Sequence, residues 1–116
     1  MSTSALATQR CEPCTKDTPP FSRQEAQRML TNIKGWRLTE NGKTLEQEFI
    51  MKDFVAARDL INEITPVAEA EDHHPDLHLT GYRKLRIVLS THAIGGLSKN
   101  DFILAAKIDD LPKNLK

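Results

Sequence analysis

Histidines and carboxylates gather in one short stretch of this chain. Three of its four histidines lie within six residues, His73, His74 and His78, and the fourth is His92. The same stretch carries four acidic residues, which are Glu69, Glu71, Asp72 and Asp76. Imidazole has an ordinary pKa that lets it give or take a proton near neutral pH, and it is also a common zinc ligand. Three interpretations are therefore open: a proton-transfer site, a metal site, or a polar loop.

The proline that follows the first two histidines weakens the metal interpretation. Pro75 biases His74 away from the helical region, so a helix that presents both His74 and His78 is disfavoured. The HExxH pattern of many zinc enzymes is absent. Adjacent side chains diverge in any regular conformation, so His73 and His74 are expected to have different roles. His73, His74 and His92 could still hold a catalytic zinc, although nothing in their spacing requires it.

The composition is typical of one soluble globular domain. The 16 Lys and Arg residues balance 16 Asp and Glu residues, so overall charge gives no argument for nucleic-acid binding. The apolar runs are too short to span a membrane. Residues 1–9 have no basic segment followed by an apolar one, as a signal peptide would. We therefore expect a cytoplasmic protein without a membrane or nucleic-acid partner.

The chain divides into a tail, residues 1–20, and a folded domain, residues 21–116. The tail is polar, carries three prolines and shows no periodicity, so it could lie on the surface of the domain. Cys11 and Cys14 form a CxxC motif in this tail. Reduced thiols are one interpretation of the pair, and a tail disulfide or a zinc site completed by histidines are the alternatives.

Hydrophobic periodicity predicts three helices and four strands. Helices are expected from Ser22 to Gly35, from Asp53 to about Glu71 and from Ser98 onward, with capping boxes opening the first and the last. Strands are expected over residues 36–39, 44–51, 77–80 and 84–91, and the turn Glu40-Asn41-Gly42-Lys43 joins the first two. Pro66 is expected to kink the second helix or restart it. This α-β-β-α-β-β-α order predicts an α+β fold, with a four-stranded antiparallel sheet and three helices packed on one face.

Residues of the histidine stretch form one spaced pattern with residues further along the chain. The pattern consists of Glu69, His73-His74-Pro75, Tyr82, His92 and Asp101. It resembles the signature of the pterin-4a-carbinolamine dehydratases, and the segments Gly35-Trp36, Leu89-Ser90-Thr91-His92 and Gly96-Leu97-Ser98 agree with it. The similarity covers roughly residues 20 to 110, and the CxxC tail resembles that of some bacterial members.

This resemblance implies an enzyme, a hydro-lyase, with a pterin substrate. The family converts 4a-hydroxytetrahydropterin, such as 4a-hydroxytetrahydrobiopterin, to quinonoid dihydropterin and water. That substrate arises when aromatic amino acid hydroxylases use tetrahydropterin, so we expect functional coupling to such a hydroxylase and a role in recycling tetrahydrobiopterin. The leaving hydroxyl needs an acid and the N5 proton needs a base, and imidazoles can supply both. No electron is transferred, so we expect neither a metal nor an organic cofactor.

The resemblance also implies roles for individual residues. His73, His74 and His92 would be catalytic, with His73 and His92 as the acid/base pair and His74 mainly positioning the substrate. Glu69 could hydrogen-bond His73 and hold its tautomer or raise its pKa. The remaining substrate-site residues implied are Pro75, Thr91, Ala93 and Asp101. Leu77 stands where many family members carry an aromatic residue, and Ala93 where some carry Glu, which puts the fine shape of the pocket in question. His78 falls outside the pattern.

Two other functions are open besides the dehydratase. Some animal members of the family serve as dimerisation cofactors of a transcription factor, so the fold could act as an interaction module. A metalloprotein that uses the histidines, with or without Cys11 and Cys14, is the third alternative. Family members form dimers or tetramers, and an edge strand of a small open sheet favours pairing, so a homodimer or homotetramer is expected.

Overall fold

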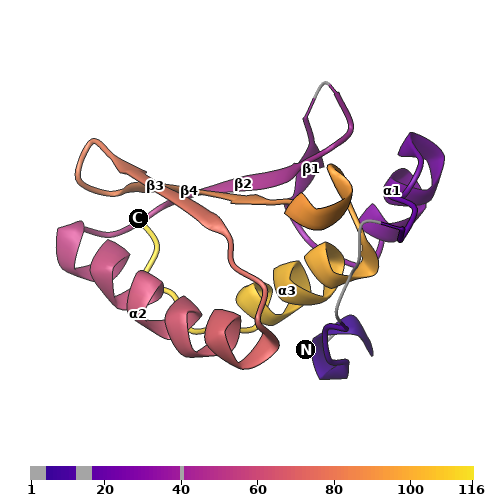
Figure 1. The fold of residues 1–116 in the computed structure, drawn as a ribbon. Helices are drawn as coiled ribbons and strands as arrows, with labels where there is room; N and C mark the ends of the chain where they lie inside the picture. The colour runs from indigo at the N-terminus through magenta and orange to yellow at the C-terminus, as the bar shows by residue number, and fades with distance from the viewer. Residues whose placement is uncertain (1–4, 13–16, 40) are drawn as a thin grey trace.

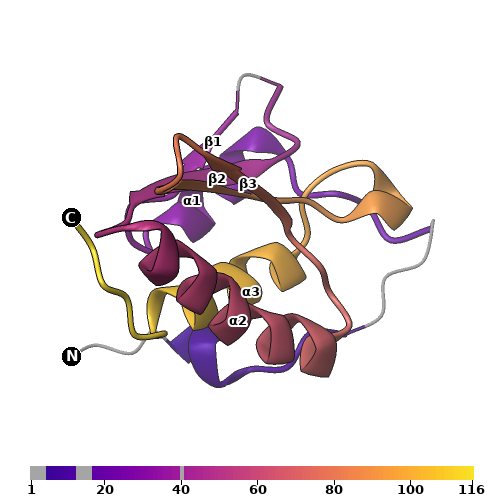
Figure 2. The ribbon, with the colours of Figure 1, turned by 90° about the vertical axis from the view of Figure 1, so that its left-hand side faces the viewer.

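The structure is a computed structural model that describes residues 5–12, 17–39 and 41–116. One antiparallel sheet has the strand order β1-β2-β4-β3, with bounds Arg37–Leu38 (β1), Leu45–Ile50 (β2), Asp76–Thr80 (β3) and Lys84–Leu89 (β4). The helices of the described residues are α1 (Arg23–Leu30), α2 (Phe54–Glu71) and α3 (Lys99–Asp109), with 3-10 turns η1 (Ala5–Thr8) and η2 (His92–Ile94). Helices α2 and α3 lie side by side below one face of the sheet (Figure 1, Figure 2). The predicted α+β fold and element order are confirmed.

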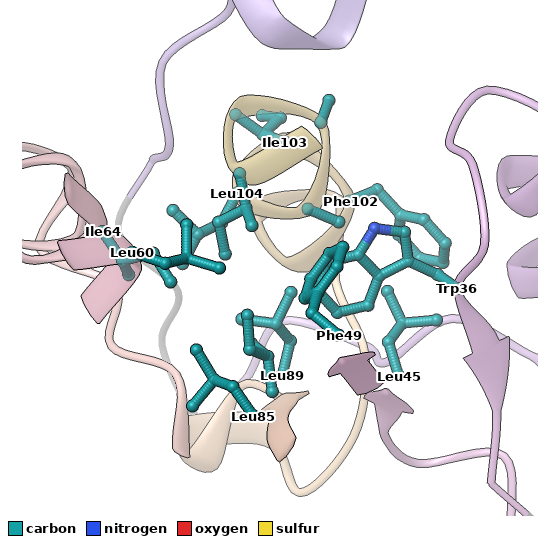
Figure 3. Packing of buried hydrophobic residues seen from close by; sticks show 14 of the residues in the cluster. Trp36, Leu45, Phe49, Leu60, Ile64, Leu85, Leu89, Phe102, Ile103 and Leu104 are labelled. Carbon is teal, nitrogen blue, oxygen red and sulfur yellow. The ribbon is translucent and has the colours of Figure 1, made fainter. Parts of the chain in front are cut away.

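The hydrophobic core fills the space between the sheet and helices α2 and α3 (Figure 3). Strands β2 and β4 turn alternate side chains toward the helices, as their predicted period of two requires. The fully or nearly fully buried side chains include Leu45, Phe49, Leu85, Leu89, Leu60, Ile64, Phe102 and Leu104. Each such side chain contributes roughly 1.5–3 kcal/mol by leaving water. Helix α3 is buried over most of its surface, so its first turn is held firmly against the end of the sheet.

Two helix boundaries differ from those predicted. Helix α1 ends at Leu30 rather than at Gly35, because the amides of Asn32 and Ile33 bond to carbonyls three residues back and tighten the chain into turns. Helix α2 runs through Pro66 without a break. Pro66 and the residue four before it are exposed, so water can solvate the carbonyl that the proline leaves unpaired. Among the described residues, none of the helices combines the length and apolarity that a membrane crossing needs.

The described part of the N-terminal tail packs on the domain. Turn η1 lies against α3, with Leu6 buried and the Lys107 ammonium donating to the carbonyl oxygen of Ala7 at 2.8 Å. Pro13 and Cys14 of the predicted tail, and Glu40 of the predicted hairpin turn, lie outside the described residues. Residues 5–12 therefore form a surface layer over α2 and α3 (Figure 2).

Candidate active site

The end of α2 places the first two histidines. Asp72 ends the helix in the left-handed conformation, with a φ of 52°. Its amide and that of His73 bond back to the carbonyls of Glu69 and Ala68, the Schellman arrangement that closes many helices. The chain then leaves the helix at a sharp angle, so His73 and His74 follow at the helix end rather than on its side. This position agrees with the predicted end of the helix at Glu71.

The fourth histidine lies on a closed loop after β4. Two hydrogen bonds between the backbones of Thr91 and Gly96 close this loop, and η2 begins inside it with His92. Gly95 turns the chain back in the left-handed region, with a φ of 65°, where glycine carries no steric cost. His92 and Ala93 are consequently exposed on a loop anchored to a rigid strand.

A cavity of about 490 Å³ joins these segments. Its lining comes from the tail, the end of α2, the loop around η2 and the start of α3, and consists of Cys11, Glu12, Ala70, Glu71, Asp72, His73, His74, Ser90, Thr91, His92, Ala93 and Asn100. Five of the eight predicted site residues therefore line one cavity, namely His73, His74, Thr91, His92 and Ala93. Three imidazoles around one cavity provide groups that can both give and accept protons near neutral pH.

The buried carboxylate of Asp101 lies beside this cavity and holds His73. Its Oδ1 is 2.6 Å from the Nε2 atom of His73. Its Oδ2 accepts from the Thr91 hydroxyl at 2.8 Å and from the Ser98 amide at 2.9 Å. Ser98 and Asp101 form the predicted capping box of α3, so one side chain both starts the helix and fixes the ring of a predicted catalytic residue.

Glu69 has a different partner from the predicted one. The predicted contact was with His73, but the Oε2 atom of Glu69 lies 2.6 Å from the Nε2 atom of His74. Both side chains of this pair are exposed. Glu69 and Pro75 line a separate, smaller pocket of about 140 Å³, which His74 also borders. His74 thus lies between the two pockets, and the carboxylate that orients His73 is Asp101.

The tail supplies a wall of the cavity that the sequence did not indicate. The Cys11 amide donates to Oε1 of Glu71 at 2.7 Å, and the backbone of Glu12 pairs with the side chain of Asn100. Burial, reinforced by the nearby Glu71 carboxylate, raises the pKa of the Cys11 thiol to about 12. In the sequence, only its position before a Pro-Pro pair sets the tail apart. The Cys11 thiol is free, and Cys14 lies outside the described residues.

Two prominent side chains of the sequence lie away from the cavity. Tyr82 is 59% exposed in the turn between β3 and β4, with a φ of 57°. The Arg83 guanidinium lies 5.6 Å from the centre of its ring. That turn is at the end of the hairpin opposite Asp76, where the chain arrives from the histidines. His78 points outward from β3 and is exposed, in agreement with its place outside the pattern.

The donor sets in the described ranges do not build a metal centre. Residues 5–12, 17–39 and 41–116 contain no group of three or more His, Cys, Asp or Glu side chains arranged to hold a metal ion. The imidazoles of His73 and His74 each contact a carboxylate instead.

Comparison with known proteins gives one consistent match. The family model described as pterin 4 alpha carbinolamine dehydratase matches residues 19–111. A mitochondrial pterin-4-alpha-carbinolamine dehydratase of Arabidopsis thaliana is 44% identical over 109 residues, 91% of this chain, and this chain spans 58% of its length. A protein of Nitrosospira multiformis named for the same dehydratase is 43% identical, with 91% of each chain covered. A Brucella melitensis structure, described as a transcriptional coactivator/pterin dehydratase, has a TM-score of 0.72 and 26% identity over 78% of this chain and 95% of its own.

Proposed function

The chain belongs to the pterin-4-alpha-carbinolamine dehydratase family, and we propose that it dehydrates a 4a-hydroxytetrahydropterin. The enzyme would be a hydro-lyase that releases water and a quinonoid dihydropterin. The observation that carries this proposal is the meeting of His73, His74 and His92 around one cavity, with His73 held by a buried carboxylate. These side chains come from two segments of the chain that the fold brings together.

The reaction needs two proton transfers. An acid protonates the hydroxyl on C4a, the C4a–O bond breaks, and water leaves. A base removes the proton from N5, and the electrons of that N–H bond form the C4a–N5 double bond. One proton is given and one is taken, so the enzyme returns to its starting protonation state after the two groups exchange a proton with each other or with water. No electron passes to or from an external acceptor, so the proposed chemistry calls for neither a metal nor an organic cofactor.

We assign the two transfers to His73 and His92, and the positioning of the substrate mainly to His74. Because the Asp101 carboxylate accepts hydrogen bonds from Thr91 and Ser98, it is suited to accept a third from Nε2 of His73. A proton kept on Nε2 makes Nδ1 the atom of this ring that exchanges protons. His92, on its exposed loop, faces the same cavity with more freedom.

The wider role that we propose follows from the substrate. A 4a-hydroxytetrahydropterin is the product of aromatic amino acid hydroxylases, so the enzyme would return the cofactor of such a hydroxylase to use, in the cytoplasm. We also propose a homodimer or homotetramer. Strand β3 is at the edge of the sheet, and its outer backbone groups are available to pair with another strand. Light scattering at several protein concentrations would test the assembly.

A direct assay tests the proposed reaction. The carbinolamine is generated in place by a hydroxylase, and its loss is followed by absorbance with and without the purified protein. We expect acceleration that His92→Ala lowers by roughly 10²- to 10⁴-fold, the usual range for removing a general acid or base. No acceleration by the wild-type protein, or an unchanged rate with His92→Ala, would contradict the proposal.

An interaction module is the second candidate, favoured by the description of the Brucella structure as a transcriptional coactivator. Among the described residues, four large apolar side chains are exposed and could serve such contacts, namely Phe54, Val55, Tyr82 and Leu115. If the protein captured a partner in pull-downs equally well after His73 and His92 were both replaced by alanine, and showed no dehydratase activity, this second function would replace the first.

A further inference from the structure

One wall of the cavity has no part in the proposed proton transfers. Residues Cys11 and Glu12 of the tail line the same cavity as the three histidines. The tail reaches this position from η1, which is fixed on α3 by the buried side chain of Leu6 and by Lys107. The position of this wall therefore depends on the packing of η1 against α3, and not on a single contact of Cys11 or Glu12.

Asn100 holds this wall from the side of α3. Its side-chain Oδ1 accepts from the Glu12 amide at 3.0 Å, and its Nδ2 donates to the Glu12 carbonyl at 2.6 Å. The same residue's backbone oxygen accepts from the Cys11 thiol at 3.6 Å. A side-chain amide that pairs with both backbone groups of one residue mimics a strand contact and fixes that residue in place. Asn100 is buried, and it directly precedes Asp101, which orients His73.

Glu71 holds the wall from the side of α2. Its Oε1 accepts from the Cys11 amide at 2.7 Å, and its Oε2 lies 3.1 Å from Nε of Arg10 and 3.7 Å from Nζ of Lys107. Burial opposes ionisation of Glu71, but the Cys11 amide and the two cations outweigh burial and hold the pKa of this carboxyl below its usual value. An ionised carboxylate is therefore kept where it can bind the tail backbone.

We propose that Cys11 and Glu12 form a substrate-binding wall of the pterin cavity, and that Asn100 and Glu71 are positioning residues that hold it there. This inference rests on the proposed function, because the ligand of the cavity is taken to be the pterin. The wall supplies no group to the proton transfers, so its contacts with the pterin would be similar in the ground state and in the transition state. Losing such uniform binding raises KM and leaves kcat nearly unchanged.

The decisive variant is Asn100→Ala, with Lys99→Ala as the matched control. Both replace a residue in the first turn of α3 with a good helix former, and the capping bonds of Ser98 and Asp101 are unaffected. Lys99 is exposed and does not line the cavity. We expect Asn100→Ala to raise KM roughly tenfold, with kcat within about twofold, from the loss of two hydrogen bonds. Glu71→Gln is a second variant, expected to raise KM by roughly threefold, since the amide oxygen can still accept from Cys11.

A chemical probe reports separately whether the tail has left the domain. In a Cys14→Ser background Cys11 is the only thiol, and its raised pKa makes alkylation by iodoacetamide at pH 8 slow while the tail is docked. Asn100→Ala should speed this alkylation by at least roughly tenfold, and Lys99→Ala should not. Thermal melting by circular dichroism shows whether each variant keeps its fold.

The outcomes separate this inference from the proposed function. If the wild-type protein is an active dehydratase and Asn100→Ala speeds alkylation without changing KM, the wall does not bind substrate and the inference is wrong. A fall in kcat at constant KM would assign the effect to Asp101 and His73, and would also overturn it. If the wild type binds 7,8-dihydrobiopterin without catalysis, the proposed reaction fails, and the inference stands only if Asn100→Ala weakens that binding by calorimetry. If the wild type neither catalyses nor binds the dihydropterin, both fall.

Discussion

Two adjacent histidines make the same contact in two different surroundings. His73 and His74 each place Nε2 at 2.6 Å from a carboxylate oxygen. The side chains of His73 and Asp101 are 11% and 0% exposed, whereas those of His74 and Glu69 are 56% and 68% exposed. The distance is identical, so the difference between the pairs lies only in burial and in the further bonds of each carboxylate.

Burial changes what such a contact can do. An exposed pair competes with water and loses side-chain entropy when it forms, so it contributes little to stability or orientation. A buried carboxylate with all its oxygens bonded cannot move without leaving polar groups unpaired, which costs free energy. Asp101 therefore fixes its histidine in one orientation, and Glu69 leaves its histidine adjustable. A positioned acid or base needs the first arrangement, and a substrate contact tolerates the second.

The sharpest way to break the comparison is to remove each imidazole in turn. His73→Ala should lower kcat by roughly 10²- to 10⁴-fold, because it removes a group that transfers a proton. His74→Ala should lower it far less and act mainly on KM, because its role is contact with the substrate. Steady-state kinetics on both variants measures the difference. Equal losses of kcat would show that burial does not separate the roles of the two histidines.

Replacing the buried carboxylate is expected to have the next largest effect. In Asp101→Asn an amide N–H takes the place of one carboxylate oxygen, so either the ring of His73 or the Thr91 hydroxyl and Ser98 amide lose their acceptor. We expect the free energy of unfolding to fall by about 1–3 kcal/mol. Activity should lie between those of the wild type and His73→Ala. Urea denaturation and kinetics on the same preparation measure both, and wild-type activity in a destabilised variant would argue against the positioning role.

Glu71 is a third carboxylate to compare with Asp101 and Glu69. Its side chain is buried, and the cations of Arg10 and Lys107 lie beside it. Its folded pKa is lowered, so its stabilising contribution is present above the ordinary carboxyl pKa of 4.5 and is lost as pH falls through the folded value. Glu71→Gln should therefore lower the melting temperature by about 2–4 °C at pH 7, and by progressively less below pH 4.5. Melting curves of both proteins from pH 3 to pH 7 test this. A constant difference across that range would contradict it.

The smallest effect is expected at the exposed carboxylate. Glu69→Gln should change the free energy of unfolding by less than about 0.5 kcal/mol, and added salt should reduce even this change. Activity should stay within roughly threefold of the wild type, because only the mobility of His74 is altered. Kinetics at low and high salt give the comparison. A tenfold loss would mean that Glu69 acts on the reaction more directly than its exposure suggests.

Sequence patterns predicted the fold closely because each pattern depends on local chemistry. Period-two strands, the two capping boxes and the end of α2 depend on residues a few positions apart, and all were found. The histidines of the site were predicted from a spaced pattern. Their carboxylate partners were not, because Glu69 is near both His73 and His74 in the sequence, and only the turn at Asp72 decides which ring faces the helix and which faces α3.

The tail and Tyr82 show where sequence reasoning stops. The tail segment has little apolar character, and the bonds that dock it join Glu12 to Asn100 and Cys11 to Glu71, residues far apart in the sequence. Nothing local signals such pairing. Tyr82 belongs to the family pattern, but its own left-handed backbone conformation after Gly81 places it in an exposed turn. The geometry of the cavity does not explain why Tyr82 belongs to the family pattern.

The Asp101 carboxylate hydrogen-bonds both the start of α3 and the ring of His73. These two contacts have a consequence for how the protein gains activity as it folds. The carboxylate that starts α3 reaches a histidine that lies 28 residues earlier in the chain. Secondary structure can form before this long-range contact does, so a refolding chain would gain its circular dichroism signal first and its activity later. The rate at which activity returns therefore reports when the start of α3 docks against the end of α2. A mutation that only frays the first turn of α3 would leave the protein folded but inactive.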